Sequence, residues 1–301
     1  MEFLREAGIT DELKDPSNRM ILLVGAADSG KTTMVASLAA FLAGNGSTCI
    51  VDLDMGQSHI GPPTTIGWGR VGREFRDWPD IVVEDFYFTG TVSPVGNLLP
   101  ALTGAKLISD KALASCGKVI VDTTGLIAEP AGRVLKQFKI DLLSPDIVLG
   151  LEHSGELDQI LGFFRFHRRP KIVRLQIPPE VEAKSVQKRS LYRFEQISSY
   201  LKDARNIEVA TDDIGVRSAA GRPEFSDDSL RNRIVSFRDG QNRDIALGVI
   251  EEVIPCSRTL VVRTPLEEGT PYTGIVIGRT EVDSTDKQVR DVPLRSRENP
   301  T

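Results

Sequence analysis

The chain has 301 residues, of which 40% are hydrophobic and 26% charged, and its formal net charge is −5. These values predict a globular protein with a core, and they argue against a protein that coats duplex nucleic acid, which needs a strong excess of Lys and Arg. Cys49, Cys116 and Cys256 are far apart and odd in number, so we expect neither a disulfide framework nor a zinc knuckle, and we expect a reducing compartment. Without an apolar N-terminal segment or a run of 18 apolar residues, the sequence predicts a cytoplasmic protein with no membrane contact.

The first two thirds of the chain alternate apolar runs with helical patterns. After a polar lead-in over 1–17, residues 20–25 form a continuous apolar run, which predicts a strand buried on both faces of a parallel sheet. A helix is predicted over 31–43 and a second strand over 48–54. Further strands are expected at 81–88, 118–122, 147–151 and 172–177, and further helices at 98–114, 131–143 and 155–166. This alternation predicts an α/β fold with a mainly parallel sheet flanked by helices.

The composition changes at Pro178. Residues 180–206 read as charged helices with few apolar positions, which predicts a helical lid over the sheet within a main domain of 18–228. From 229 to 283, apolar runs at 245–250, 259–263 and 274–278 follow one another without helices and predict a small β domain. Residues 284–301 are polar and contain proline, and we expect a disordered tail there.

A phosphate-binding loop lies between the first predicted strand and helix. The segment Gly25-Ala-Ala-Asp-Ser-Gly-Lys-Thr32 matches G-x-x-x-x-G-K-[ST], and its position lets backbone N–H groups and a helix N-terminus surround phosphate oxygens. Lys31 is expected to bridge the β- and γ-phosphates, and the Thr32 hydroxyl to coordinate Mg²⁺. The guanine-reading Asn-Lys-x-Asp element does not occur, which favours ATP. The residues predicted to bind the nucleotide are Gly25, Ala26, Ala27, Asp28, Ser29, Gly30, Lys31, Thr32 and Thr33.

Two carboxylates follow at the end of the second predicted strand. Asp52 and Asp54 are two residues apart, so their side chains point to the same face near the phosphate loop. One could hold the Mg²⁺ shell while the other activates a hydroxyl. The alternative is that both aspartates cap the next turn.

The sequence around these carboxylates resembles a known family. Asp52-Leu-Asp-Met-Gly-Gln57 and Gly61-Pro-Pro-Thr-Thr65 resemble the Asp-x-Asp-x-Gly-Gln signature and Gly-Pro-Pro loop of the polynucleotide 5′-hydroxyl kinases, whose eukaryotic members act in RNA 3′-end processing, tRNA splicing and rRNA maturation. Phe88-Thr-Gly-Thr-Val-Ser-Pro94 and Asp122-Thr-Thr-Gly125 are similar to further motifs of that family, and Arg189-Ser-Leu-Tyr-Arg193 to its lid motif. The similarity extends from about residue 18 to 206, in a compact prokaryotic-type form.

The resemblance implies an ATP- and Mg²⁺-dependent kinase of the 5′-hydroxyl end of RNA or DNA, with a single-stranded substrate. It makes Asp54 the general base and Asp52 a metal ligand beside Thr32, although the two aspartates could exchange roles. Lys31, Arg189 and Arg193 would stabilise the transferred phosphoryl group. Substrate contacts are implied for Gln57, Pro63, Thr64, Thr65, Thr124 and Gly125.

One position departs from the family, and two other functions stay open. The eukaryotic members carry a substrate-clasping Trp where this chain has Leu126, which cannot stack on a base and leaves the choice between RNA and DNA open. The first alternative function is an ATP-binding assembly factor in RNA processing that transfers no phosphate. The second is a P-loop kinase for a small metabolite.

Overall fold

The computed structural model describes residues 4, 8–177, 185–218, 225 and 228–293, and the chain divides into two compact units. The first unit comprises Met1–Gly61, Thr65–Thr89 and Ser93–Ser185. The second comprises Pro62–Thr64, Gly90–Val92 and Val186–Thr301. The short loops Pro62–Thr64 and Gly90–Val92 therefore belong to the second unit, although the rest of that unit comes from residues 186–301.

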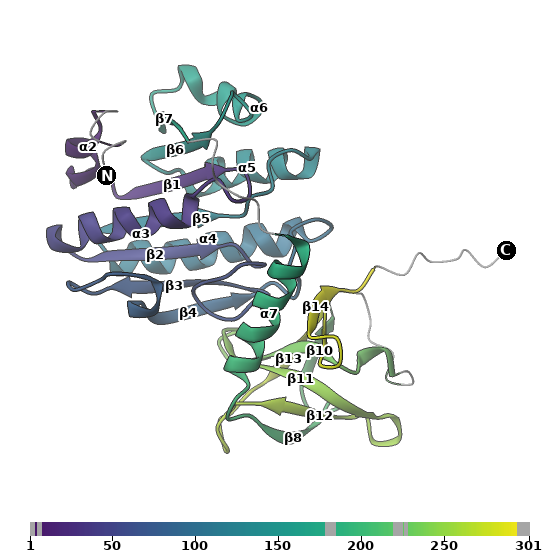
Figure 1. The fold of residues 1–301 in the computed structure, drawn as a ribbon. Coiled ribbons are helices and arrows are strands. Elements are labelled where there is room, and N and C mark those ends of the chain that lie inside the picture. Colours follow the sequence, from purple (N-terminus) through teal and green to yellow (C-terminus); the bar gives the residue numbers. More distant parts are fainter. Residues whose placement is uncertain (1–3, 5–7, 178–184, 219–224, 226–227, 294–301) are drawn as a thin grey trace. The chain divides into compact units, whose positions relative to one another are not determined.

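The first unit is a seven-stranded sheet in the order β4-β3-β2-β5-β1-β6-β7 (Figure 1). Strands β2, β5, β1, β6 and β7 are parallel, and β3 and β4 extend one edge in antiparallel pairing. The strands are β1 Met20–Gly25, β2 Thr48–Leu53, β3 Thr65–Val71, β4 Val82–Phe88, β5 Lys118–Thr123, β6 Ile147–Glu152 and β7 Lys171–Gln176. The helices are α2 Thr10–Lys14, α3 Lys31–Leu42, α4 Leu98–Ser115, α5 Pro130–Leu143 and α6 Asp158–Leu161.

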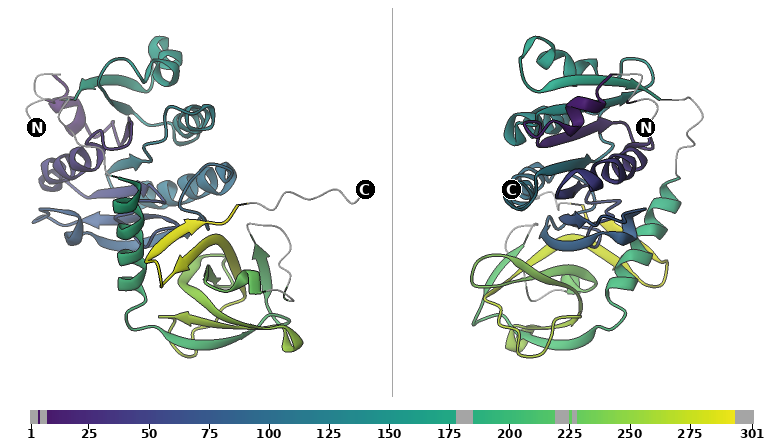
Figure 2. Two further views of the ribbon diagram at one scale, coloured as in Figure 1. Left: turned by 45° about the vertical axis from the view of Figure 1, so that its right-hand side comes forward. Right: turned by 90° about the vertical axis from the view of Figure 1, so that its left-hand side faces the viewer.

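Helices cover both faces of this sheet, as the second view of Figure 2 shows. Helices α2 and α3 pack on one face, and α4, α5 and α6 pack on the other. Strands β1, β2, β5 and β6 are buried along their whole length, which explains why their sequences are continuous apolar runs rather than alternating ones. The carboxyl ends of these parallel strands meet at one edge of the sheet, where ligands bind in open α/β folds.

The predicted α/β fold with a mainly parallel sheet is confirmed, and one strand was not foreseen. Strand β3 contains Gly67 and Gly69, which weaken a strand pattern in the sequence. A side chain at Gly67 would collide with the Ile60 carbonyl, and one at Gly69 with Ile81. The helix expected over 155–166 is α6 followed by a 3₁₀ helix, Gly162–Phe166.

The expectation about the cysteines is wrong for one pair. The sulfur atoms of Cys49 and Cys116 lie within bonding distance, and the structure pairs them as a disulfide with Cα atoms 6.1 Å apart. Cys49 lies in β2 and Cys116 follows α4, and both belong to the same core cluster. Their separation of 67 residues hid this proximity, because it arises from the pairing of β2 with β5, which places Thr48 opposite Lys118.

The second unit contains helix α7, Val186–Tyr200, and a second sheet in the order β14-β13-β10-β11-β12-β8, with β9 paired to β13. Its strands are β8 Arg205–Ala210, β9 Gly215–Ser218, β10 Arg233–Arg238, β11 Asp244–Ile254, β12 Thr259–Thr264, β13 Gly274–Asp283 and β14 Gln288–Asp291. The predicted boundary at 229 is therefore wrong, because β8 and β9 precede it. The predicted tail over 284–301 contains β14, and residues 294–301 lie outside the described residues. Of the predicted lid, 180–184 also lies outside them.

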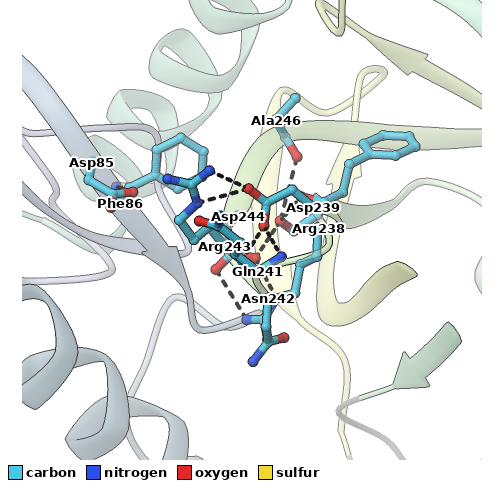
Figure 3. Close-up of polar contacts among 11 residues, drawn as sticks. Asp85, Phe86, Arg238, Asp239, Gln241, Asn242, Arg243, Asp244 and Ala246 are labelled. Atoms are coloured by element: carbon cyan, nitrogen blue, oxygen red, sulfur yellow. Dashed lines mark hydrogen bonds and ion pairs between the residues drawn. The ribbon is translucent and has the colours of Figure 1, made fainter. Parts of the chain in front are cut away.

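A buried ion pair closes the turn between β10 and β11 (Figure 3). Arg238 donates from Nε to Asp244 Oδ1 at 2.8 Å and from Nη2 to Oδ2 at 3.1 Å. Its Nη1 donates to Asn242 Oδ1 at 3.0 Å, and the Ser236 hydroxyl donates to Asp244 at 2.7 Å. Both charges are thus matched by a partner of opposite sign and by further hydrogen bonds.

Among the described residues, every helix is too short or too polar to span a bilayer.

Candidate active site

The phosphate loop has the predicted placement between β1 and α3. Gly30 has φ of 79° and Asp28 has φ of 57°, so the loop turns through left-handed backbone at two positions. A side chain at Gly25 would lie 2.6 Å from Ser29 Oγ and 2.7 Å from the Leu151 carbonyl. Glycine is required there because the loop folds back against the end of β6. The nine predicted nucleotide-binding residues are contiguous around this turn.

The Lys31 side chain lies inside the loop. Its Nζ donates to the Ala26 carbonyl at 2.6 Å and to Ser29 Oγ at 3.5 Å, and the residue is buried. Burial lowers the pKa of Lys31, while Asp122, Asp54 and Asp28 act in the opposite direction. A cation held by weak neutral acceptors at this position can transfer its N–H bonds to phosphate oxygens, which are stronger acceptors.

Asp122 is the site residue whose role the sequence did not reveal. The Thr32 hydroxyl donates to Asp122 Oδ2 at 3.1 Å, so the carboxylate lies next to the predicted metal ligand. Asp122 is the register partner of Asp52 on the neighbouring strand. Its position in the motif Asp122-Thr-Thr-Gly125 was a signal, but its contact with Thr32 depends on how α3 and β5 meet.

Asp52 and Asp54 differ in what they contact. Asp52 Oδ1 accepts from the Asp54 amide at 2.9 Å, and Oδ2 accepts from the His59 amide at 2.6 Å and the Ile60 amide at 3.3 Å. Asp54 is half-buried, and its Oδ1 accepts from the amides of Gly56 and Gln57, both at 3.0 Å. Both carboxylates therefore accept backbone amides of the loop after β2, as the capping alternative predicts, and Asp54 stands closer to solvent.

The carboxylates at this edge repel one another. Burial, followed by repulsion from Asp54, raises the pKa of Asp52 to about 7. Burial, followed by repulsion from Asp52, raises the pKa of Asp122 to about 6, and Lys31 opposes that rise. Carboxylates that destabilise one another in a buried site attract a cation.

The oxygen donors at this edge fit Mg²⁺. Thr32, Asp122 and Asp52 offer hydroxyl and carboxylate oxygens, the ligands that Mg²⁺ prefers, together with phosphate and water. No group of three or more His, Cys, Asp or Glu side chains among the described residues is arranged to hold a metal alone. Mg²⁺ is usually bound by one or two carboxylates together with substrate phosphates, so this set of donors would hold it with the nucleotide.

The predicted substrate residues Thr124 and Gly125 lie directly beside the phosphate loop. A side chain at Gly125 would collide with the backbone of Ala27, so the segment after β5 packs backbone to backbone on the loop. Behind this segment, helix α5 buries Lys136 and Lys139, which the sequence analysis did not single out. They share the buried face of the helix with Leu135, Ile140 and Leu143, but Phe138 and Leu142 are exposed, so the apolar pattern of the sequence did not identify this face.

The remaining predicted residues are divided between the two units. Gln57 belongs to the first unit, and its Nε2 donates to the Gly56 carbonyl at 3.0 Å. Pro63 and Thr64 belong to the second unit and are buried, as is Thr65. Thr64 has φ of 77°, a strained value for a β-branched residue.

Within the second unit, β14 links the predicted lid helix to the loops from the first half of the chain. Arg193 of α7 donates from Nε to the Val289 carbonyl at 3.2 Å, and Arg189 is half-buried one turn earlier. Asp291 Oδ1 accepts from the Val92 amide at 3.0 Å. The Gly90 amide donates to the Thr64 carbonyl at 3.4 Å. Strand β14 thus makes hydrogen bonds to the predicted lid helix and to the loop at Gly90–Val92, and Gly90 in turn contacts Thr64.

Residues 25–203 match the family described as mRNA cleavage and polyadenylation factor CLP1 P-loop. The chain is 34% identical over 195 residues to a protein from Methanocaldococcus jannaschii named polyribonucleotide 5′-hydroxyl-kinase. The aligned region covers 64% of this chain and 53% of that relative. It is 31% identical over 230 residues to a protein of the same name from Pyrococcus horikoshii, covering 75% of this chain and 62% of the relative. The chain thus matches between half and two thirds of the length of these relatives.

The fold is similar to that of Clp1p in the solved structure of the wild-type Clp1p–Pcf11p complex. The TM-score is 0.73 at 15% sequence identity, and the match covers 93% of this chain and 79% of that chain. At this identity the likeness concerns the fold. The matched part is 93% of the chain and is longer than either unit, so the likeness in fold extends over residues of both units.

Proposed function

Because the chain belongs to the CLP1 P-loop family, we propose that it transfers the γ-phosphoryl group of ATP to the 5′-hydroxyl end of a polynucleotide. The observation that carries the proposal is the meeting of Lys31, Thr32 and the carboxylates of Asp52, Asp54 and Asp122 at one edge of the first sheet. Phosphoryl transfer needs positioned cations, a metal site and a group that orients the acceptor hydroxyl, and this edge offers all three.

The phosphate loop binds and orients the nucleotide. Its backbone amides and the N-terminus of α3 surround the phosphates, and Lys31 exchanges the Ala26 carbonyl for phosphate oxygens. Thr32 and Asp122 would hold Mg²⁺, with Asp52 beside them, and Asp28 to Thr33 would complete the nucleotide site. When bound there, Mg²⁺ would neutralise charge that develops on the phosphate oxygens.

Asp54 is the proposed general base. The amides of Gly56 and Gln57 fix Oδ1, which leaves Oδ2 to accept the proton of the acceptor hydroxyl. Asp52 is not suited to this role, because amide hydrogen bonds engage both of its oxygens. This difference between the two carboxylates favours Asp54 as the base and Asp52 as the metal-side residue.

The proposed acceptor is RNA, with DNA as a second possibility. The names of the archaeal relatives favour RNA, and Gln57, Thr124 and Gly125 are the proposed contacts of the terminal nucleotide in the first unit. Pro63, Thr64 and Thr65 shape the substrate path, mainly through their backbone because their side chains are buried. Arg189 and Arg193 of α7 are proposed to close on the γ-phosphate during transfer.

The test is transfer of label from γ-labelled ATP with Mg²⁺ to matched single-stranded RNA and DNA oligonucleotides that carry 5′-hydroxyl ends. We expect labelled RNA with the wild-type protein and none with Lys31→Ala. Nucleotide binding measured on the same samples separates the alternatives. ATP binding without label on either oligonucleotide would support the non-catalytic assembly factor, and labelling of a small metabolite instead would support the metabolite kinase.

A further inference from the structure

Helix α5 buries two lysines while it leaves large apolar side chains in solvent. Lys136 is 1% exposed and Lys139 is 0% exposed, whereas Phe138 between them is 56% exposed. Hydrophobicity alone would rotate the helix to bury Phe138 and expose the lysines. Since a buried ammonium group costs several kcal/mol unless it is well paired, specific contacts must stabilise the observed rotation.

The contacts of Lys136 all reach one short segment. Its Nζ donates to Thr123 Oγ1 at 2.8 Å, to Thr124 Oγ1 at 3.3 Å, and to the Thr124 carbonyl. These three acceptors belong to two consecutive residues at the end of β5. Burial, followed by repulsion from Lys139 and Lys31, lowers the pKa of Lys136, while Asp54 and Asp122 act in the opposite direction. The nitrogen can bond to all three oxygens in either protonation state, because a neutral amine donates to two of them and accepts from the Thr124 hydroxyl.

The segment that Lys136 holds connects the two halves of the proposed site. Thr123 donates from Oγ1 to the Leu23 carbonyl of β1 at 2.7 Å, and its amide donates to Asp122 Oδ1 at 2.8 Å. Asp122 in turn accepts the Thr32 hydroxyl. Gly125, two residues after Thr123, packs on the backbone of Ala27 in the phosphate loop. A displacement of this segment would therefore move both the metal-side carboxylate and the wall of the phosphate loop.

We propose that Lys136 is a positioning residue for phosphoryl transfer, which holds residues 123–125 so that Asp122 meets Thr32 and Gly125 lies against the phosphate loop. This inference rests on the proposed function. Lys136 acts through the segment and does not itself contact the nucleotide. Its removal should mainly lower kcat, because misplacement of reacting groups by a fraction of an ångström to an ångström costs up to about 10²-fold in rate.

Lys139 provides a matched control on the same helix. It lies one turn after Lys136, is equally buried, and its Nζ has no hydrogen-bond partner among the described residues. Substituting either lysine with methionine removes one buried amine and keeps an unbranched side chain that is one heavy atom shorter. Only the change at position 136 also removes the hydrogen bonds to Thr123 and Thr124.

The experiment compares Lys136→Met with Lys139→Met in the full chain. Steady-state labelling of a 5′-hydroxyl RNA gives kcat and the KM values for ATP and RNA, at a temperature where thermal melting shows that both variants are folded. We expect Lys136→Met to lower kcat by about 10- to 100-fold with both KM values within about threefold of wild type. Lys139→Met should keep kcat within about threefold. Equal kcat values for the two variants, or a loss in Lys136→Met confined to the melting temperature, would overturn the inference.

A second variant covers the case in which Lys136→Met does not fold. Thr123→Val keeps the shape of the side chain but removes one acceptor of Lys136, and we expect a smaller loss, of roughly 3- to 10-fold in kcat, with unchanged KM values. A wild-type kcat in Thr123→Val together with a folded protein would contradict the positioning role. Absence of labelling by the wild-type protein would instead contradict the proposed function, so the two failures are distinguishable.

Discussion

The two units of the chain both bury charged side chains, but they treat them in opposite ways. In the second unit, Arg238 and Asp244 form a bidentate pair, and Ser236 and Asn242 complete their hydrogen bonds. In the first unit, repulsion from Asp54 adds to the raised pKa of Asp52, and repulsion from Asp52 adds to the raised pKa of Asp122. A fully matched pair stabilises a turn, whereas unmatched charges are kept where a ligand or a reaction completes them. The comparison separates buried charges that stabilise the fold, such as Arg238 and Asp244, from buried carboxylates that are placed to bind a ligand, such as Asp52 and Asp122.

The largest expected effect is at Asp54. If its Oδ2 accepts the proton of the acceptor hydroxyl, Asp54→Asn should lower kcat about 10²- to 10⁴-fold, the range of general base catalysis, while ATP still binds. Asp54→Asn keeps the Oδ1 acceptor of the Gly56 and Gln57 amides, so the loop should keep its shape. Rapid-quench labelling of RNA measures the rate, and equilibrium nucleotide binding is the control. A rate within about threefold of wild type would remove Asp54 from the mechanism.

The second prediction concerns stability at the matched pair Arg238–Asp244 of the second unit. Arg238→Ala leaves the Asp244 carboxylate buried without its cation, and we expect a loss of about 3–5 kcal/mol in the free energy of unfolding of that unit. The double variant Arg238→Met/Asp244→Leu should recover most of this loss, because it removes both charges. Urea denaturation followed by circular dichroism measures both. A loss below about 1 kcal/mol in the single variant would show that the pair is not a structural element.

Replacing the buried cation of Lys139 with the neutral side chain of methionine should stabilise the protein. Burial lowers the pKa of Lys139 from 10.5 to about 8, so the folded state is penalised wherever the unfolded lysine is charged. The penalty is complete below pH 8 and disappears as the pH rises from about 8 to 10.5. Lys139→Met should therefore raise the free energy of unfolding by about 3 kcal/mol at pH 7. The difference between variant and wild type should shrink across that alkaline window, and denaturation at pH 7 and pH 10 measures it. A less stable variant at pH 7 would contradict the lowered pKa.

The smallest expected effect concerns the family Trp that is replaced by Leu126. Leu126 is half-buried and follows Gly125, beside the proposed position of the terminal nucleotide. Stacking of one base on an aromatic ring is worth about 1–3 kcal/mol, so Leu126→Trp should lower the KM for RNA by about 5-fold or more without a change in kcat. Leu126→Met serves as the size control. An unchanged KM in the Trp variant would show that the terminal base lies elsewhere.

Local patterns in the sequence were sufficient to predict the phosphate loop, the apolar strands of the first sheet and the helices between them. Features that depend on distant pairing were not predictable in this way. Asp122 was recognised as part of a motif, but its contact with Thr32 arises from the packing of α3 on β5. The short strands β8 and β9 acquire their partners from far along the chain. The hydrogen bonds of Lys136 to the end of β5 likewise depend on the packing of α5 on the sheet.

The most direct test of the proposed function uses two RNA oligonucleotides of one sequence, one with a 5′-hydroxyl end and one with a 5′-phosphate end. Both are incubated with γ-labelled ATP, Mg²⁺ and either the wild-type protein or Asp122→Asn. We predict label on the 5′-hydroxyl RNA alone, and a rate for Asp122→Asn that is lower by at least about 10-fold at low Mg²⁺ because the carboxylate beside Thr32 is lost. Equal labelling of both RNAs, or ATP binding without any labelling, would contradict a kinase of 5′-hydroxyl ends.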